Sequence, residues 1–420
     1  MPTPQPPTRL DRRIGTADAV VIGLGSMIGA GVFAALAPAA QSAGGGLLVG
    51  LAIAAAVAFA NATSSAQLAA LHPQAGGTYV YGRARLAPVW GFAAGWGFVV
   101  GKTASCAAMA LTFGSYAWPD HPRFTAALAV VALVAVNLAG VTKTVWLTRV
   151  IVVVVLCVLA VVVGAGFGGG TADIDRIGLG GASPYDCLRA GALLFFAFAG
   201  YARIATLGEE VRDPARTIPR AIPIALGITL IVYALVALSA LSAVGSDALA
   251  RSSAPLATVI DAGSWHALVP LVRIGASTAS LGVLLSLLVG VSRTMFAMAA
   301  ERDLPHVLVH VHPRTKVPDL AEIAVGTIVF IVVLTSDVRH AIGFSSFCVL
   351  GYYAVTNAAA LRLPRDQRRW PPAIAVFGLV GCVVLAVTLP GASIATGAAA
   401  IAVGLITRAT LRAVRRADRS

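Results

Sequence analysis

Charged residues are scarce in this chain of 420 residues. Asp, Glu, Lys and Arg together make up 12% of the chain, whereas hydrophobic residues make up 58%. A soluble chain carries about twice that charged fraction. The composition therefore argues against a soluble globular protein and favours a membrane protein, provided that the apolar residues form runs long enough to span a bilayer.

Residues that could build a metal, redox or catalytic centre are few and scattered. The five cysteines show no CxxC spacing and lie in or at the edge of apolar runs, so we expect neither disulfides nor metal ligation. The seven histidines show no metal-binding spacing, and no HExxH, GxSxG or P-loop sequence occurs. We expect no cofactor, no metal and no enzymatic activity.

Long apolar runs are abundant. A spanning helix needs roughly 20 mostly apolar residues, and about twelve segments approach that length. Their centres fall near Gly29, Ala55, Val100, Ala132, Val155, Phe198, Tyr233, Leu284, Ile328, Leu350, Gly378 and Ala399. The sequence therefore predicts an all-α membrane protein with about 12 transmembrane helices and no separate soluble domain.

The net charge of +13 would suit a nucleic-acid partner, but the basic residues cluster in alternate loops. With the N-terminus inside, the cytoplasmic clusters are Arg9, Arg12 and Arg13; Arg83 and Arg85; Lys143; Arg212, Arg216 and Arg220; Arg302, Arg314 and Lys316; Arg362, Arg365, Arg368 and Arg369; and Arg408, Arg412, Arg415, Arg416 and Arg419. The other loops carry only Arg123, Arg176, Arg251 and Arg339. This positive-inside pattern predicts a multi-pass protein of the cell membrane with both termini cytoplasmic, and no nucleic acid as partner.

The chain divides into three parts. Residues 1–13 are Pro-rich and are expected to form a disordered cytoplasmic N-terminus. The longest outside loop, from about Gly168 to Asp186, separates two five-helix blocks. Because five is odd, the second block starts on the opposite side of the membrane, as an inverted repeat requires. We expect a transporter core over residues 14–365, and helices 11 and 12 with a cytoplasmic tail over residues 366–420.

The first predicted span contains three glycines within seven residues, Gly25, Gly29 and Gly31. Each glycine weakens a helix by about 1 kcal/mol relative to alanine. A break here would present backbone N–H groups beside the N-terminus of the following half-helix, whose partial positive charge suits a carboxylate. The alternative is helix packing, because Gly25 and Gly29 form a GxxxG pair.

The sixth predicted span contains a second candidate break at Gly200, in the run Phe195 to Tyr201. It occupies the same place in the second block as the glycine run in the first. Paired interruptions at corresponding positions are the best sequence indication of a transporter site. Gly200 alone would be read as a packing glycine, but the pairing weakens that alternative.

These segments resemble the amino acid–polyamine–organocation superfamily, and in particular prokaryotic members similar to cationic amino acid transporters. The resemblance covers roughly residues 14–365. It is carried by Gly25 to Phe33, Phe195 to Ile222, Ser292 to Ala299 with Leu304 and Pro305, and Tyr352 to Asn357. It implies the LeuT-type 5+5 inverted repeat, with helices 1 and 6 broken at the midplane.

The resemblance also implies which residues bind substrate. The backbone of Met27, Ile28, Gly29, Ala30 and Gly31 would bind a carboxylate, and carbonyl groups around Phe196, Ala197, Phe198 and Ala199 would bind an amine. In one respect the chain departs from the pattern. Some prokaryotic relatives carry a lysine in helix five, where this chain has Val155. The resemblance therefore does not imply proton coupling through a lysine at this position.

Four charged residues are candidates for coupling or gating. Lys102 lies in the middle of the third predicted span, where a charge costs at least about 2.5–3.5 kcal/mol on insertion scales. It would be an internal cation or a proton carrier, or else a lysine that snorkels to the interface. Arg203 would be a gate or an anion contact, or else an ion-pair partner of Glu209 or Glu210. The two glutamates would also join neighbouring arginines in closing an inner gate.

Together these observations predict a secondary active transporter, a permease that moves amino acids by alternating access. The substrate would be an amino acid or amine, with a coupling proton or a counter-substrate as a possible second partner and the lipid bilayer around it. A polyamine or organic amine exchanger, a channel and a non-transporting membrane sensor are the alternatives. A membrane-embedded enzyme would need an acid–base or metal constellation that the sequence does not offer.

Overall fold

The computed structural model describes residues 14–29, 31–72, 76–140, 145–178, 181–205 and 210–417. Within them every regular element is a helix, apart from a parallel β-bridge between Ile14 and Val211. The α-helices are α1 (Thr16–Met27), α2 (Gly31–Ala43), α3 (Leu47–Leu71), α4 (Thr78–Arg85), α5 (Pro88–Ala117), α6 (Pro122–Leu138), α7 (Val145–Gly168), α8 (Pro184–Phe198), α9 (Ala202–Ala205), α10 (Pro214–Arg251), α11 (Pro255–Asp261), α12 (Val269–Ala300), α13 (Asp319–Thr335), α14 (Val338–Leu361), α15 (Pro372–Thr388) and α16 (Gly391–Ala417). The 3₁₀ segments are η1 (Gly44–Gly46), η2 (Ile174–Ile177), η3 (Ala199–Tyr201), η4 (His266–Leu268), η5 (His306–Val309) and η6 (Arg365–Gln367).

The lengths and composition of the helices match a bilayer. Within the described residues, eight segments are long and apolar enough to cross a membrane, and three shorter apolar helices, α1, α6 and α15, accompany them. Eleven of the twelve expected helix centres lie in helices, and Gly29 lies in the gap between α1 and α2. The prediction of an all-helical membrane protein is confirmed at this level.

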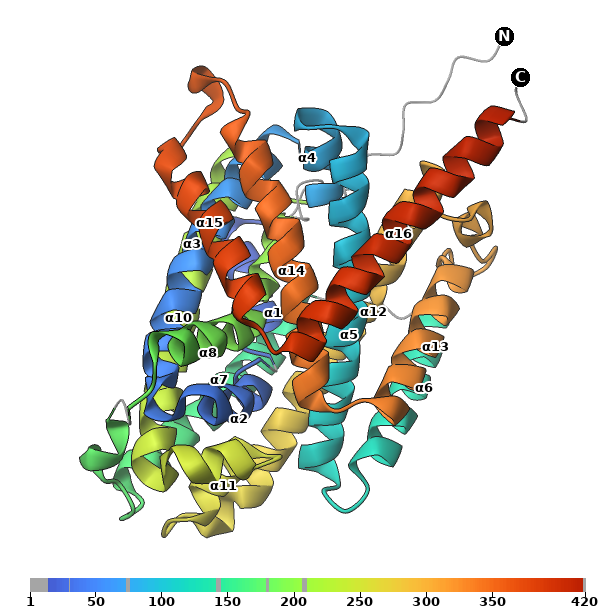
Figure 1. The fold of residues 1–420 in the computed structure, drawn as a ribbon. Helices are drawn as coiled ribbons and strands as arrows, with labels where there is room; N and C mark the ends of the chain where they lie inside the picture. Colours follow the sequence, from blue (N-terminus) through green and yellow to red (C-terminus); the bar gives the residue numbers. More distant parts are fainter. Residues whose placement is uncertain are drawn as a thin grey trace.

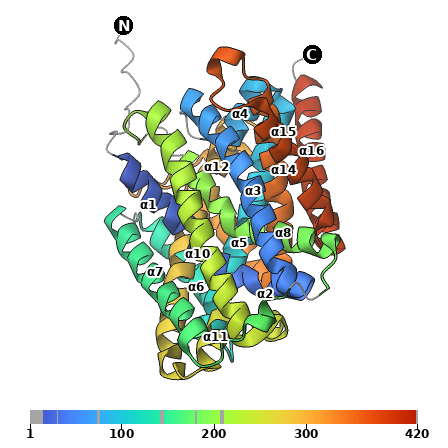
Figure 2. The ribbon, with the colours of Figure 1, turned by 90° about the vertical axis from the view of Figure 1, so that its left-hand side faces the viewer.

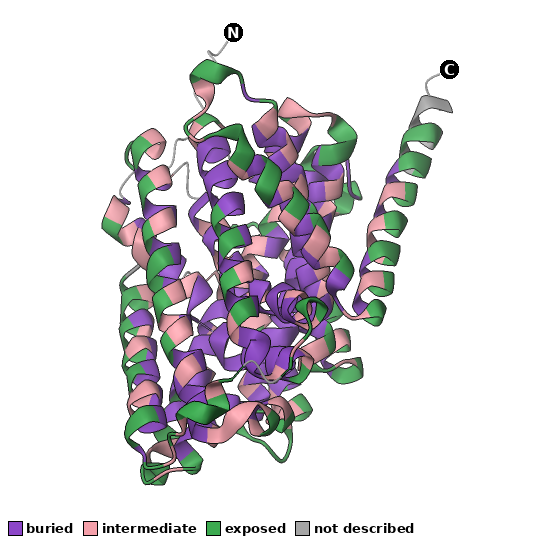
Figure 3. Ribbon diagram, turned by 60° about the vertical axis from the view of Figure 1, so that its left-hand side comes forward, coloured by how far each residue is buried: buried purple, intermediate pink, exposed green. Residues whose placement is uncertain are grey.

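The distribution of buried and exposed residues also fits a protein surrounded by lipid. Figure 3 shows buried residues concentrated along the middle of the bundle and exposed residues on its outer faces. Many of the exposed side chains are large and apolar, such as Val153 of α7, Ile231 of α10 and Ile406 of α16, the last two being 62% and 63% exposed. So large an apolar surface would be unfavourable in water, and it fits a surface that faces lipid.

Helix α5 forms the centre of the bundle and packs closely on α12 and α14 (Figure 1). Small residues permit the approach: a Cβ added to Gly101 would lie 2.8 Å from Cys348 Cβ on α14. The hydroxyl groups of Ser105 and Ser345 add an interhelical hydrogen bond of 2.7 Å. Small residues and hydroxyl hydrogen bonds are the usual means of helix association in lipid, where the hydrophobic effect does not drive helices together.

Helices α4 and α16 end at the same end of the bundle (Figure 1). Figure 1 shows α4 and the end of α16 at one end of the bundle, and α11 at the other. In the view of Figure 2, α1 and α7 lie on the opposite side of the bundle from α16. Arg83 of α4 and Arg408 and Arg412 of α16 therefore gather at one end, where all three contact Asp303.

Two short helices were not expected from the sequence. Helix α4 lies between the predicted spans centred near Ala55 and Val100, and α11 follows α10 directly. Neither has an apolar run of spanning length, so a search for spans passes over both. The expected disorder of residues 1–13 concerns residues outside those that the structure describes.

Candidate functional site

The first helix is interrupted where the glycine run predicted. Helix α1 ends at Met27, and the N–H of Ile28 donates to Leu24 O at 2.8 Å to close its last turn. Helix α2 begins at Gly31. Its first N–H groups have no partner within the helix, so this end of α2 carries partial positive charge. Of the predicted carboxylate-binding residues, Ala30 lies outside the described part of the chain.

The second interruption lies at the end of α8. The α-helix ends at Phe198 and continues as the 3₁₀ segment η3 and the single turn α9. The N–H of Ala199 is shared between Phe195 O and Phe196 O, which leaves other carbonyl groups of this last turn without partners inside the helix. Helices α1 and α2 are thus separated near Ile28, whereas near Ala199 the α-helix changes to a 3₁₀ turn within a helical run that continues to Ala205.

The two interruptions lie against each other. A Cβ added to Gly31 would lie 2.5 Å from Ala197 Cα, and one added to Gly200 would lie 2.3 Å from Ser26 O. Both are contacts with backbone atoms, which a change of rotamer cannot relieve. The glycines are therefore needed for the approach of two chain segments, and the packing interpretation and the site interpretation apply to the same residues.

Tyr233 of α10 joins the two interruptions. Its hydroxyl group lies 2.5 Å from Met27 O, at the end of α1, and 3.1 Å from Ala197 O, at the end of α8. Since a hydroxyl group has a single hydrogen, the two carbonyl oxygens share one donor. The Tyr233 ring packs edge-on against Phe198, with ring centroids 5.1 Å apart. Sequence reasoning missed Tyr233, because a lone tyrosine in an apolar span gives no signal.

The remaining predicted substrate-binding residues surround this contact. Met27, Ile28, Ala197, Phe198 and Ala199 are all buried. The side chain of Phe196 is partly buried and packs against the core. A Cβ added to Gly29 would lie 2.1 Å from Val283 Cγ2, so α12 forms the wall opposite the first interruption.

Lys102 is buried at the midpoint of α5 and does not snorkel to an interface. Its Nζ lies 3.5 Å from Ala199 O, just beyond the last turn of α8. The hydroxyl group of Tyr353, on α14, lies 3.5 Å from the same oxygen. The C-terminal end of a helix carries partial negative charge, so this position favours a cation. The structure thus places Lys102 beside the predicted site.

Buried polar side chains of α3 and α14 pack against η3. The rings of Tyr201 and Tyr353 stack with their centroids 5.1 Å apart, and the hydroxyl group of Tyr201 lies next to Asn61 of α3. Asn357 of α14 donates through its side-chain N–H to Asn61 Oδ1 at 2.6 Å. These contacts fix the second interruption to α3 and α14.

Arg203 of α9 lies past the second interruption and is partly buried. It interacts electrostatically with Glu210 and with Arg293 of α12. The backbone carbonyl of Glu210 accepts a hydrogen bond from the N–H of Ile14 at 3.1 Å. Of the two glutamates proposed as partners of Arg203, Glu209 lies outside the described residues.

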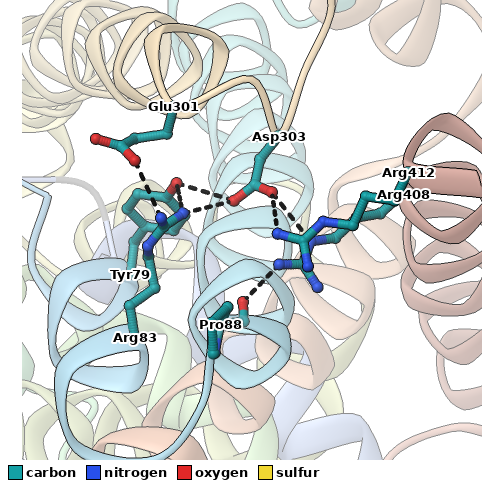
Figure 4. A network of polar contacts seen from close by, with 7 residues as sticks. All are labelled: Tyr79, Arg83, Pro88, Glu301, Asp303, Arg408 and Arg412. Atoms are coloured by element: carbon teal, nitrogen blue, oxygen red, sulfur yellow. Dashed lines mark hydrogen bonds and ion pairs between the residues drawn. The ribbon is translucent and has the colours of Figure 1, made fainter. Parts of the chain in front are cut away.

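A second cluster, which we call the Asp303 network, ties three parts of the basic end together (Figure 4). Asp303 follows α12 and is 2% exposed through its side chain. Its Oδ2 accepts hydrogen bonds from the hydroxyl group of Tyr79 at 2.9 Å and from Arg83 at 3.0 Å, both on α4. Its Oδ1 accepts from Arg408 at 3.0 Å and Arg412 at 3.4 Å, both on α16.

The electrostatics of this network are consistent with its geometry. Burial raises the pKa of Tyr79, and the neighbouring Asp303 carboxylate raises it further, so the hydroxyl group stays protonated and donates. Arg408 also donates to Pro88 O at 2.9 Å. The sequence alone did not indicate the partners of Asp303 on α4 and α16.

We expect Gly200→Ala to destabilise the protein by roughly 1–3 kcal/mol, because the added methyl group meets the backbone of α1. Thermal unfolding in detergent measures the change. Gly227→Ala is the matched control, since an added Cβ at Gly227 has no atom within 4 Å. Equal stability of the two variants would show that the interruptions do not depend on close contact.

We expect Asp303→Asn to destabilise the protein by roughly 3 kcal/mol, because the buried Arg408 and the neighbouring Arg412 then lack their counter-charge. Asp213→Asn is the control. Asp213 pairs with Arg216 at 3.6 Å on the surface, where ion pairs contribute little. If Asp303→Asn were as stable as Asp213→Asn, the Asp303 network would not hold α12, α4 and α16 together.

Comparison with known proteins agrees with this geometry. The profile of the amino acid permease family matches residues 18–408. A Mycobacterium tuberculosis protein named as an uncharacterized transporter is 59% identical over 98% of this chain and 94% of its own length. Human cationic amino acid transporter 4 is 28% identical over 87% of this chain and 61% of its own length. A branched-chain amino acid permease of Bacillus subtilis is 24% identical over 94% of this chain and 92% of its own length. The chain is a multi-pass membrane transporter and belongs to the amino acid permease family of the amino acid–polyamine–organocation superfamily.

Proposed function

We propose that this protein is a secondary active transporter that carries amino acids across the cell membrane by alternating access. The observation that carries the proposal is the contact between the two helix interruptions. There the N-terminal end of α2 meets the C-terminal end of α8 within a buried core. An amino acid is a zwitterion, so its carboxylate suits the first end and its ammonium group suits the second.

Each group of the substrate has a proposed partner. The N–H groups of the segment from Met27 to Gly31 bind the carboxylate, as anions bind at helix N-termini. The carbonyl groups of Phe196, Ala197, Phe198 and Ala199 bind the ammonium group. The Tyr233 hydroxyl group contacts a carbonyl oxygen at each interruption. When the two interruptions move apart during transport, its hydrogen bond therefore shifts from one of these oxygens to the other.

The wider architecture is part of the same proposal. The core over residues 14–365 has the LeuT-type 5+5 inverted repeat. Helices α1 and α2 form its first span, and α8, η3 and α9 form its sixth. Residues 366–420 add the eleventh and twelfth spans and a cytoplasmic tail, and both termini lie in the cytoplasm. Arg203, Glu209 and Glu210 take part in the gate on the cytoplasmic side.

The names of the relatives leave the side chain of the substrate open, because they include both cationic and branched-chain amino acids. A polyamine or organic amine exchanger would use the ammonium-binding half of the site alone. A channel or a sensor would not need two interruptions in contact.

Counterflow in proteoliposomes tests the proposal. We expect liposomes preloaded with unlabelled substrate to take up labelled amino acid faster than empty liposomes, because a carrier reorients faster when it is loaded. Gly29→Val serves as the inactive variant, since its side chain would collide with Val283 and with the backbone oxygen of Gly25, and its thermal unfolding separates lost transport from misfolding. Uptake that is independent of preloading would instead indicate a channel, and no uptake of any amino acid or amine would indicate a sensor.

We also propose that Lys102 either carries the coupling proton or supplies a fixed positive charge to the site. Lys102→Ala is then expected to lose the dependence of transport on pH, or to lose transport about tenfold or more at every pH. Uptake measured across a pH series distinguishes the two results, and ligand-induced thermal stabilisation separates lost transport from misfolding. Wild-type transport with wild-type pH dependence in Lys102→Ala would contradict both roles.

A further inference from the structure

The helices around the two interruptions carry few acidic residues. Contacts at the interruptions come from α1, α2, α5, α8, η3, α10, α12 and α14. These elements contain three acidic residues, Asp18, Asp186 and Asp247. Each lies near an end of its helix. Asp18 pairs with Arg149, and Asp186 caps the start of α8 through Ser183. A substrate at the interruptions therefore meets no carboxylate of these elements.

The acidic residues on neighbouring elements are engaged elsewhere. Glu322 of α13 is buried and accepts a hydrogen bond of 2.6 Å from Asn137 of α6. Glu210 interacts with Arg203. Asp303 is surrounded by arginines at the basic end of the bundle. Of these three, Glu210 and Asp303 lie beside arginines, and Glu322 is hydrogen-bonded to a neutral amide.

A cation is already present at the interruptions. The buried Lys102 directs its Nζ to Ala199 O, so its charge lies at the end of α8 where the ammonium group of the substrate is proposed to bind. In its neutral form, Lys102 would still supply no negative charge. A second positive group on the substrate would have to be buried beside Lys102 without a counter-charge, which is among the least favourable arrangements in a protein interior.

We infer that this site accepts amino acids with uncharged side chains and that Lys102 excludes lysine, arginine and polyamines. The inference rests on the proposed function and narrows its substrate. At an effective dielectric constant of about 20, two cations about 8 Å apart repel strongly enough to weaken binding by roughly 10- to 100-fold. The apolar wall around the interruptions, formed by Ile28, Ala197 and Val283, provides contact for an uncharged side chain instead.

Competition in counterflow tests the inference on the intact protein. Proteoliposomes preloaded with leucine, valine or alanine are expected to exchange, whereas lysine, arginine and putrescine are expected to compete at least about tenfold more weakly. Wild-type protein that exchanges lysine or arginine as well as leucine would overturn the inference and leave the proposed function standing. Failure to exchange or bind any amino acid would contradict the proposed function itself.

Two substitutions test whether Lys102 is the residue that excludes cationic substrates. Lys102→Met removes the charge at similar volume, and it is expected to improve competition by arginine relative to leucine by about tenfold or more. Lys102→Arg retains the charge and is expected to retain the exclusion. Thermal stabilisation by each amino acid, measured on the purified variants, gives the same comparison where transport is lost. An unchanged ratio of arginine to leucine in a folded Lys102→Met variant would show that Lys102 does not set the preference.

Discussion

The structure depends on two helix ends that meet inside an apolar bundle. A helix end leaves backbone groups without partners, and lipid offers none, so such ends persist only where protein surrounds them. Here the ends partner each other and a few side chains. Tyr233 covers carbonyl oxygens of both, Lys102 and Tyr353 approach Ala199 O, and Gly31 and Gly200 let the backbones touch. Each of these residues is constrained by that single contact.

The rest of the bundle can be read as support for this contact. Helix α5, buried along most of its length, carries Lys102 to the middle of the bundle and packs on α12 and α14. The contacts of Tyr201 and Asn357 with Asn61 hold η3 against α3 and α14. At the basic end, the Asp303 network joins the end of α12 to α4 and α16, far along the chain from the interruptions. Any rearrangement of the end of α12 relative to α4 or α16 must therefore move, or break, a network of buried charges.

What the sequence could predict is what depends on local pattern. Apolar runs located the helices, the glycine run located the gap between α1 and α2, and the cost of a charge in lipid singled out Lys102, with its direction left open. The missed features depend on contacts between distant residues. Tyr233 lies 206 residues from Met27, and Arg408 lies 105 residues from Asp303. No local pattern distinguishes such a tyrosine or arginine from others in the chain, since their partners are set by packing.

The two polar centres differ in how their charges are balanced, and this difference bears on which of them can exchange partners with a ligand. Asp303 is held by the full charges of three arginines at hydrogen-bonding distance, so a ligand that replaced it would leave the buried Arg408 without its counter-charge. At the interruptions the charge of Lys102 faces only the partial charges of helix ends, and one hydroxyl group is shared by two carbonyls. Exchanging a shared hydrogen bond, or a weak contact of 3.5 Å, for a contact with a bound zwitterion costs little. A transporter must release its ligand as readily as it binds it. The centre built from partial charges meets that requirement, whereas the centre built from ion pairs is suited to holding helices in place.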